Sequence, residues 1–468
     1  MSRYKAIVIG SGAGGAPVAH RLAEFWGGGV AIVEAGEHFK ASDFTQREYE
    51  MVNKLYAGGG LQGTEDGSVG FIGAKAVGGS TVINDAICFK PPKEMVERWK
   101  RYGVDVDWGE LSQQVAQVEQ FMRVSDLPRT MINAPNYKLG LGAARMGWHG
   151  ERLRHNSVGC VQCGFRHTGC AYNAKQSMNL SFVPKAVAAG ATLFPQTRAL
   201  TLEADGDGWK VHTDTQGELT ADVVVVCAGV VQTPRLLLAS GIDAGQGVQA
   251  HLSTLAWGEF DEVLDPFNGI PMSYGVLEFA DVYGRTGPGY VIEGVSVQPV
   301  TFSVQSLAEG PTKQEILERY RHLAGALCVL RSKARGSISL GAGGRPVIHY
   351  PTIPEDTERL RHFYQRATEL YLAAGAKRVL LAHGSTRWVT EPPAGDLPMV
   401  AGGFYQYAAH QFGGACRGTT LDGEGRVKGQ KNLWVLDASG FPEALGVNPQ
   451  VTIAAVARIG AERILAGS

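Results

Sequence analysis

Three glycines near the amino end of the chain have the spacing of a dinucleotide-binding loop. Gly10, Gly12 and Gly15 form the pattern G-x-G-x-x-G. In such a loop the first glycine permits a tight turn, the second lets the backbone approach a pyrophosphate, and the third lets a helix pack closely on a strand. Glu34 ends the next apolar run, where a carboxylate accepts hydrogen bonds from ribose hydroxyls and would repel a 2′-phosphate. The pattern therefore predicts a dinucleotide other than NADP, and it fits FAD and NAD equally.

The elements that must position this loop have the order strand, helix, strand. Residues 4–10 form a short, β-branched, apolar run that ends in glycine, as in a buried strand. Residues 13–25 carry apolar side chains at helical spacing, and residues 30–34 are a second apolar run. Together they predict a β-α-β unit, which is the setting in which the glycine pattern is informative.

Apolar runs farther along the chain predict the rest of the architecture. Residues 222–228 and 432–437 are typical of buried strands that extend the same sheet. Residues 354–374 predict an amphipathic helix that Gly375 ends. Between about residues 256 and 400 the local signals are weaker, and we expect a separate unit there that faces the substrate.

Composition excludes several classes of partner. The chain has 468 residues, 44% hydrophobic and 19% charged, which is the balance of a globular α/β protein. The formal net charge is −1, so no nucleic-acid partner is expected. The most apolar stretch, residues 222–241, is broken by polar residues, so no transmembrane segment is expected. The start of the chain and its seven cysteines, an odd number, predict a cytoplasmic protein without a disulfide framework.

Three further stretches resemble the glucose-methanol-choline (GMC) family of oxidoreductases. The first is residues 73–84 (GAKAVGGSTVIN), and the second runs from Ala228-Gly229 to residue 241. The third combines residues 410–414 (HQFGG), 425–429, 432–439 and 446–453 (GVNPQVTI), and is similar to the carboxyl end of cholesterol oxidases and long-chain alcohol oxidases. The stretches follow one another in the family's order, so the resemblance implies FAD as the cofactor.

The resemblance also implies a fold and a set of FAD contacts. The implied fold is α/β, with a Rossmann-like FAD-binding domain on a mostly parallel sheet and an inserted α+β substrate-binding domain on an antiparallel sheet. We expect residues 1–95, 180–255 and 400–468 in the FAD-binding domain, and residues 96–179 and 256–399 in the substrate-binding region. The expected FAD contacts are Gly10, Gly12, Gly15, Glu34, Gly78, Gly79, Ser80, Asn84, Ala199, Ala228, Gly229, Asp437, Asn448, Pro449 and Thr452.

Two catalytic residues follow from the same resemblance. His410 stands where the family places a histidine over the flavin, and Asn448 stands where it has a partner His or Asn. The implied reaction is the oxidation of a small-molecule alcohol to an aldehyde or ketone. Neutral His410 would take the hydroxyl proton, hydride would leave for flavin N5, and Asn448 would orient the oxygen. From the residues alone, His410 could be an ordinary core histidine, and Asn448 could cap the helix that Pro449 is expected to begin.

A cysteine cluster leaves a further question open. Cys160, Cys163 and Cys170 lie in a segment that resembles one branch of the family, where another cysteine often stands at the position of Arg166. Three thiols with a nearby histidine could hold an iron–sulfur cluster or zinc. Because the fourth cysteine is missing, we expect no metal here, and instead reduced thiols or a local disulfide.

Other functions remain open at this stage. A flavin-dependent disulfide reductase would use Cys160 and Cys163 as a dithiol, but it would need a second glycine-rich nucleotide motif, which the sequence does not show. A non-redox lyase of the same family would also bind FAD and keep His410, and a flavin-carrying subunit without turnover would keep the fold. Neither the alcohol nor the electron acceptor, whether oxygen, a quinone or another protein, follows from the sequence.

Overall fold

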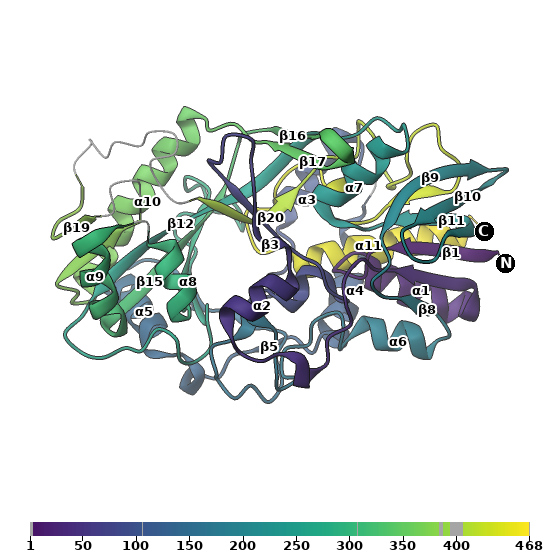
Figure 1. The fold of residues 1–468 in the computed structure, drawn as a ribbon. Coiled ribbons are helices and arrows are strands. Elements are labelled where there is room, and N and C mark those ends of the chain that lie inside the picture. The colour runs from purple at the N-terminus through teal and green to yellow at the C-terminus, as the bar shows by residue number, and fades with distance from the viewer. Residues whose placement is uncertain (1–2, 105, 307, 383–386, 394–405, 468) are drawn as a thin grey trace.

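The computed structural model describes residues 3–104, 106–306, 308–382, 387–393 and 406–467. This part of the chain forms two large sheets, and both termini lie at the end of the molecule that holds the smaller one (Figure 1). The smaller sheet has seven strands: β8 (Thr192–Phe194), β2 (Val30–Val33), β1 (Tyr4–Ile9), β11 (Glu218–Val226), β10 (Gly208–Thr213) and β9 (Ala199–Asp205) in order, with β21 (Leu433–Val435) also on β11.

The smaller sheet is parallel where it carries the glycine loop. β1 pairs in parallel with β2 and β11, and β11 pairs in parallel with β21, whereas β9 and β10 are antiparallel. Its parallel strands β1, β2 and β21 are largely apolar runs because both faces are covered. Ile7 packs with side chains of α7 (Gly229–Ala239), and the neighbouring Ala6 and Val8 pack with those of α1 (Gly15–Trp26) and α11 (Gln450–Ala466).

The larger sheet has twelve strands and is mainly antiparallel. Its longest strand, β12 (Gln246–Glu259), lies between β15 and β20 and is antiparallel to both. The full set is β3 (Tyr56–Gly63), β4 (Gly70–Ala74), β20 (Tyr407–Phe412), β12, β15 (Leu323–Arg331), β14 (Tyr290–Val295), β13 (Tyr274–Val276) and β6 (Gly150–Arg152), with β16 (Gly336–Leu340), β17 (Pro346–His349), β18 (Arg378–Leu381) and β19 (Arg387–Val389) attached.

Helices cover both sheets. α5 (Ala134–Met146) and α10 (Pro354–Ala373) pack together against β12 and β15, at the far end of the molecule from the termini (Figure 1). The other helices are α2 (Glu48–Leu55), α3 (Lys93–Trp99), α4 (Trp108–Phe121), α6 (Phe182–Ala188), α8 (Pro299–Gln305) and α9 (Gly310–Arg319), and a two-stranded ribbon joins β5 (Ser125–Asp126) to β7 (Arg154–His155). No described helix is long and apolar enough to span a bilayer.

The expected fold class is confirmed, with local differences. The β-α-β unit, the two later strands and the helix ending before Gly375 are all present. α11 begins at Gln450 rather than at Pro449, which instead precedes the helix as its cap. The strands β3, β4 and β20 come from ranges expected in the FAD-binding domain but join the larger sheet. The division into domains stays a prediction, and its boundary at 399/400 lies outside the described residues.

Candidate active site

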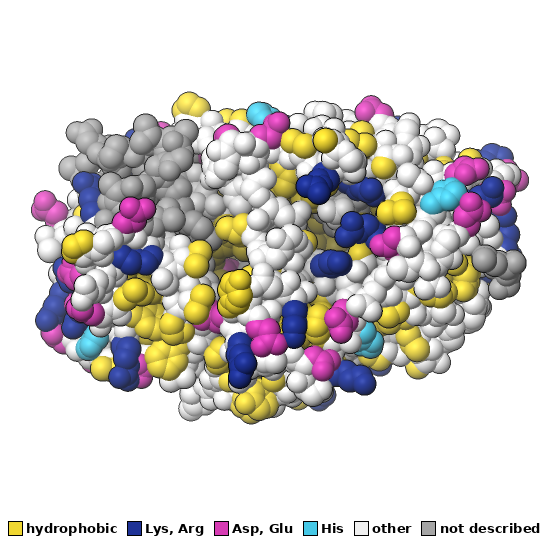
Figure 2. All heavy atoms as spheres, viewed as in Figure 1, with side chains coloured by type: hydrophobic (Ala, Val, Ile, Leu, Met, Phe, Trp, Pro, Cys, Tyr) yellow, Lys and Arg dark blue, Asp and Glu magenta, His cyan; other side chains and the backbone are white. Residues whose placement is uncertain are grey.

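A cavity of about 920 Å³ is lined by elements of both sheets. Its opening appears as a hollow in the space-filling view (Figure 2). Most of the predicted FAD and catalytic residues line it, although they come from both ends and the middle of the chain. They are Gly10, Gly12, Glu34, Gly79, Ser80, Asn84, Ala199, Ala228, Gly229, His410, Asp437, Asn448 and Pro449. The remaining three, Gly15, Gly78 and Thr452, do not line it.

The first glycine loop lies directly against the second. A Cβ on Gly79 would lie 2.7 Å from the Cα of Gly12, so the two glycine loops touch through their backbones. A Cβ on Gly15 would lie 1.9 Å from the carbonyl oxygen of Gly10. Gly15 therefore allows α1 to pack on β1, which is the part expected of the third glycine, and it does so without lining the cavity.

Ser11, which the sequence reasoning missed, ties these loops to Glu34. The Ser11 backbone N–H and hydroxyl both donate to Glu34 Oε2, at 3.0 and 2.7 Å. The Gly78 N–H donates in turn to the Ser11 hydroxyl oxygen at 2.9 Å. The other carboxylate oxygen, Oε1, accepts from the Gly36 N–H at 2.8 Å and still has acceptor capacity toward the cavity that Glu34 lines.

Asp437 holds the beginning of α7 at the opposite wall. Its Oδ2 accepts from the Gly229 N–H at 2.8 Å and from the Thr233 hydroxyl at 2.7 Å. Its Oδ1 accepts from the Ser439 N–H at 2.8 Å. The end of β21 is thereby fixed to the first turn of α7. A Cβ on Gly229, whose φ is +86°, would have no other atom within 4 Å.

Positive side chains stand near the glycine loops. Lys75, Arg198, Arg235 and Arg345 all line the cavity, and dark-blue side chains gather beside the hollow in Figure 2. The cavity therefore offers close backbone approach and positive charge together, which are the features that a diphosphate requires. The residues present fit a flavin dinucleotide.

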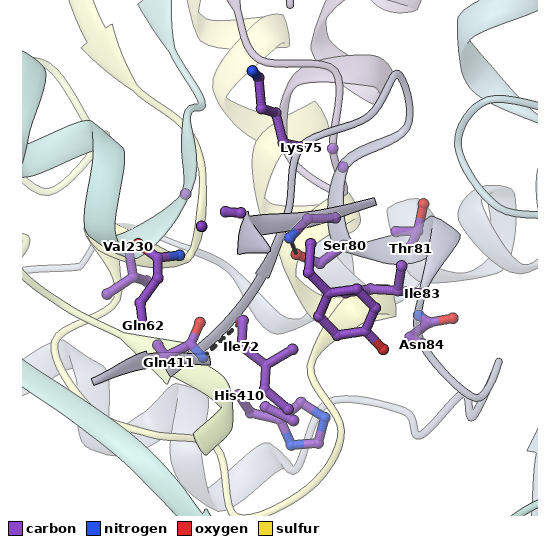
Figure 3. A pocket seen from close by; sticks show the side chains of 18 of the residues that line it. Gln62, Ile72, Lys75, Ser80, Thr81, Ile83, Asn84, Val230, His410 and Gln411 are labelled. Carbon is purple, nitrogen blue, oxygen red and sulfur yellow. Dashed lines mark hydrogen bonds between the residues drawn. The ribbon is translucent and has the colours of Figure 1, made fainter. Parts of the chain in front are cut away.

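Asn84 is fixed by α11 and by a buried lysine. Asn84 donates through Nδ2 to Gln450 Oε1 at 3.0 Å, and Gln450 donates to the Ile87 carbonyl. The Lys175 ammonium donates to the carbonyls of Val82 and Asn84, both at 2.7 Å. This wall segment, whose Asn84 side chain is labelled in Figure 3, is therefore held from two sides.

The cysteine segment supports that wall from behind. Arg166 donates to the Asp85 carbonyl at 2.9 Å and to Cys160 Sγ at 3.5 Å. Cys160, Cys163 and Cys170 are free thiols, and none of the three lines the cavity. Within the described residues, no three His, Cys, Asp or Glu side chains are arranged to hold a metal ion. The arrangement gives the segment a supporting role, and a dithiol at Cys160 and Cys163 would not reach the cavity.

His410 lies on β20 at the cavity floor, beside a second histidine that the sequence reasoning did not single out. Its Nδ1 lies 3.1 Å from Nδ1 of His251, which is its cross-strand neighbour on β12. Gln411 donates through Nε2 to the Ile72 carbonyl at 2.9 Å, which ties β20 to β4 (Figure 3). Burial lowers the pKa of His410 to about 4, so its imidazole is neutral near pH 7.

Asn448 does not cap α11. Its side chain lies close to Glu293, a fully buried carboxyl on β14 that also lines the cavity. Burial, and then the nearby Asp85, raise the pKa of Glu293 to about 8, although the Asn448 side chain opposes this. Asn448 Oδ1, Glu293 Oε1 and Asp85 Oδ1 are buried without a protein partner. Buried polar atoms are normally paired, so this group is arranged for a ligand in the cavity.

Comparison with known proteins agrees with this geometry. Residues 52–253 and 332–457 match the amino-terminal and carboxyl-terminal models described as GMC oxidoreductase. A GMC-type oxidoreductase of Mycobacterium tuberculosis is 30% identical over 100% of this chain and 76% of its own length. A long-chain-alcohol oxidase of Arabidopsis thaliana is 27% identical over 97% of this chain and 66% of its own length.

Solved structures share the fold at low identity. A pyridoxine 4-oxidase from Mesorbium loti superposes with a TM-score of 0.72 at 17% identity, over 99% of both chains. A formate oxidase variant from Aspergillus oryzae superposes with a TM-score of 0.75 at 16% identity, over 100% of this chain and 98% of that one.

The Ser11 hydroxyl provides a test of how the cavity is held. In Ser11→Ala, the buried Gly78 N–H loses its acceptor and Glu34 loses one donor. Leaving a buried group unpaired costs about 1–3 kcal/mol, so we expect a lower Tm and weaker retention of dinucleotide. Ser112→Ala, which removes an exposed hydroxyl on α4, is the control and should leave both unchanged. If Ser11→Ala had the same Tm as the parent, the hydrogen bonds of the Ser11 hydroxyl would contribute nothing to stability.

Proposed function

Since the chain belongs to the GMC oxidoreductase family, we propose that it oxidises the hydroxyl group of a lipophilic alcohol. The family model covers most of the chain, and members of this family are FAD-dependent, so the cofactor is FAD. The observation that carries the proposal is the meeting of the glycine loops, His410, Asn448 and Glu293 around one cavity. When bound, FAD supplies a two-electron acceptor for hydride from the carbon that bears the hydroxyl.

The protein's own groups then handle the oxygen and its proton. His410 and the Asn448 amide face the cavity and can hydrogen-bond a hydroxyl oxygen. The proton must leave that oxygen for a side chain of the same cavity. His410 is the acceptor that the sequence implies, and Glu293, whose Oε1 is unpartnered, is a second candidate.

The mouth of the cavity supports a lipophilic substrate. Tyr49 on α2, Leu61 on β3, and Val300 and Val304 on α8 line the cavity and are exposed, Tyr49 by 78% and Val304 by 65%. Hydrophobic side chains surround the hollow in Figure 2. Exposed apolar groups gathered at one opening favour an alkyl-bearing ligand.

A single carboxylate joins the two helices of this mouth. Glu48 on α2 accepts from the N–H groups of Val300 and Thr301 in the first turn of α8, at 2.8 and 2.9 Å, and from the Thr301 hydroxyl at 2.6 Å. Three donors on one carboxylate fix the distance between the helices. The mouth is therefore a defined opening between parts of the chain some 250 positions apart.

His410→Ala tests whether this residue takes part in alcohol oxidation. We expect the rate constant for flavin reduction by a primary alcohol to fall by about 10²–10⁴-fold, the range for loss of a group that assists proton transfer. The measurement is anaerobic loss of the flavin absorbance in a stopped-flow instrument.

Flavin content should remain parental in His410→Ala, and the exposed His349→Ala should behave as the parent. If His410→Ala reduced flavin as fast as the parent, this histidine would have only a structural role. If no alcohol in an anaerobic screen bleaches the parent flavin, the non-redox and assembly alternatives are favoured.

A series of primary alcohols from ethanol to dodecanol tests the lipophilic site. Burying one methylene contributes about 0.8 kcal/mol, so kcat/KM should rise up to about fourfold per added methylene until the site is filled. Val304→Asp at the mouth should reduce this slope without changing the rate with ethanol. The matched control is Val263→Asp, which is 50% exposed and does not line the cavity. A flat series would contradict the proposal.

A further inference from the structure

We propose that His251 is a positioning residue that fixes the tautomer of His410, so that His410 presents an N–H to the cavity instead of a lone pair. The inference deepens the proposed function and rests on it in one respect, since the cavity must receive a substrate oxygen. It changes the part that His410 plays, from proton acceptor to hydrogen-bond donor.

The pairing of β12 and β20 brings the two rings together. His251 and His410 are cross-strand partners, and directly beside them the register shifts, so that Leu252 pairs with Ala408 and Ala409 is the extra residue. A bulge of this kind re-aims the neighbouring side chain. The ring planes of His251 and His410 stand at 89°, and their Nδ1 atoms are 3.1 Å apart.

A backbone N–H determines which nitrogen of His251 carries the proton. The Gly446 N–H donates to His251 Nε2 at 2.9 Å, and a backbone N–H can only donate. His251 Nε2 must therefore hold a lone pair. Because His251 is neutral, its proton is on Nδ1, where it points at Nδ1 of His410.

The proton on His410 follows from the same chain of bonds. His410 Nδ1 must accept from His251, so the single proton of neutral His410 is on Nε2. Protonating His410 would set two N–H groups against each other across 3.1 Å, and protonating His251 would set its Nε2–H against the Gly446 N–H across 2.9 Å. The pKa of His251 is held well below its usual value by burial, and further by His410 and by Arg331, which is paired with Asp281. His251 and the Gly446 N–H, neither of which lines the cavity, thus keep His410 neutral with its proton on Nε2.

If His410 always carries its proton on Nε2, a group other than His410 must accept the hydroxyl proton. His410 donates to the substrate oxygen and stabilises the negative charge that develops there as the O–H bond breaks. The proton passes to the Glu293 carboxylate, and the C–H electron pair leaves as hydride to the bound two-electron acceptor. Glu293 faces Asp85 and Asn448, and its raised pKa of about 8 means that the carboxylate forms as pH rises. Flavin reduction should therefore increase with pH up to about that value, well above the pKa of His410.

The tautomers can be read directly by nitrogen NMR. The FAD-loaded protein is labelled with ¹⁵N-histidine, and the His410 and His251 signals are assigned by their loss in His410→Gln and His251→Asn. Two-bond ¹H–¹⁵N spectra separate the two neutral forms of a ring. We expect Nε2–H on His410 and Nδ1–H on His251. Nδ1–H on His410 would overturn the proposal, and this readout needs no turnover, so it is independent of whether alcohols are substrates.

His251→Asn and His251→Asp introduce side chains of the same shape but present a donor and an acceptor, respectively, to His410. Asn at 251 keeps a donor toward His410 Nδ1, whereas His251→Asp places an acceptor there, which draws the His410 proton to Nδ1 and raises its pKa. We expect His251→Asp to reduce flavin about 10²–10³-fold more slowly than the parent, as when one donor to a developing oxyanion is removed. His251→Asn should stay within about tenfold of the parent.

The rates of these two variants distinguish His410 as a hydrogen-bond donor from His410 as a base. If His410 were the base, the Asp–His pair of His251→Asp would strengthen it, and this variant would be faster than His251→Asn, which would overturn the proposal. If His251→Asp does not fold, the parent spectrum and the parent pH profile still decide, since a profile that rises only near pH 4 also contradicts the inference.

Discussion

The contact between the backbones of Gly12 and Gly79 is the constraint on which the rest of the site depends. It joins the loop after β1 to the loop before the wall that carries Asn84, and Ser11 secures the contact through Glu34 and the Gly78 N–H. A side chain at Gly79 would force the two loops apart, because its Cβ would lie 2.7 Å from the Gly12 Cα. With these loops fixed, the loop before α1 and the first turns of α7 and α11 all line one cavity, and strands of the larger sheet line it as well.

Much of this site could be predicted from the sequence because its parts are local motifs. The glycine spacing, the apolar strands and the similarity around His410 each depend on neighbouring residues, and the structure gathers them around the cavity. Gly15 was expected to let α1 pack closely on β1, and it does so although it does not line the cavity. The position of Pro449 was predicted only to within one residue, since propensity does not distinguish a cap from a first helical position.

Other functional residues could not be found in this way because their meaning is tertiary. His251 and Glu293 lie within strands that carry no recognisable motif. Only the pairing of β12 with β20 and the turn before α11 bring their partners beside them. Ser11 did stand within the glycine pattern, so a hydroxyl at the second position was an available signal. The cysteine spacing left reduced thiols or a local disulfide as the expectation, and it did not indicate that the neighbouring Arg166 and Lys175 bind backbone carbonyls of the cavity wall.

The Glu48 joint between α2 and α8 concentrates the hold on the mouth in one side chain. Its three hydrogen bonds converge on a single carboxylate, so loss of that side chain would remove all three together. The width of the opening between two distant stretches of the chain therefore depends on one residue, whereas His410 and Glu293 are carried by strands of the larger sheet. Access to the cavity and the chemistry within it thus belong to different parts of the chain.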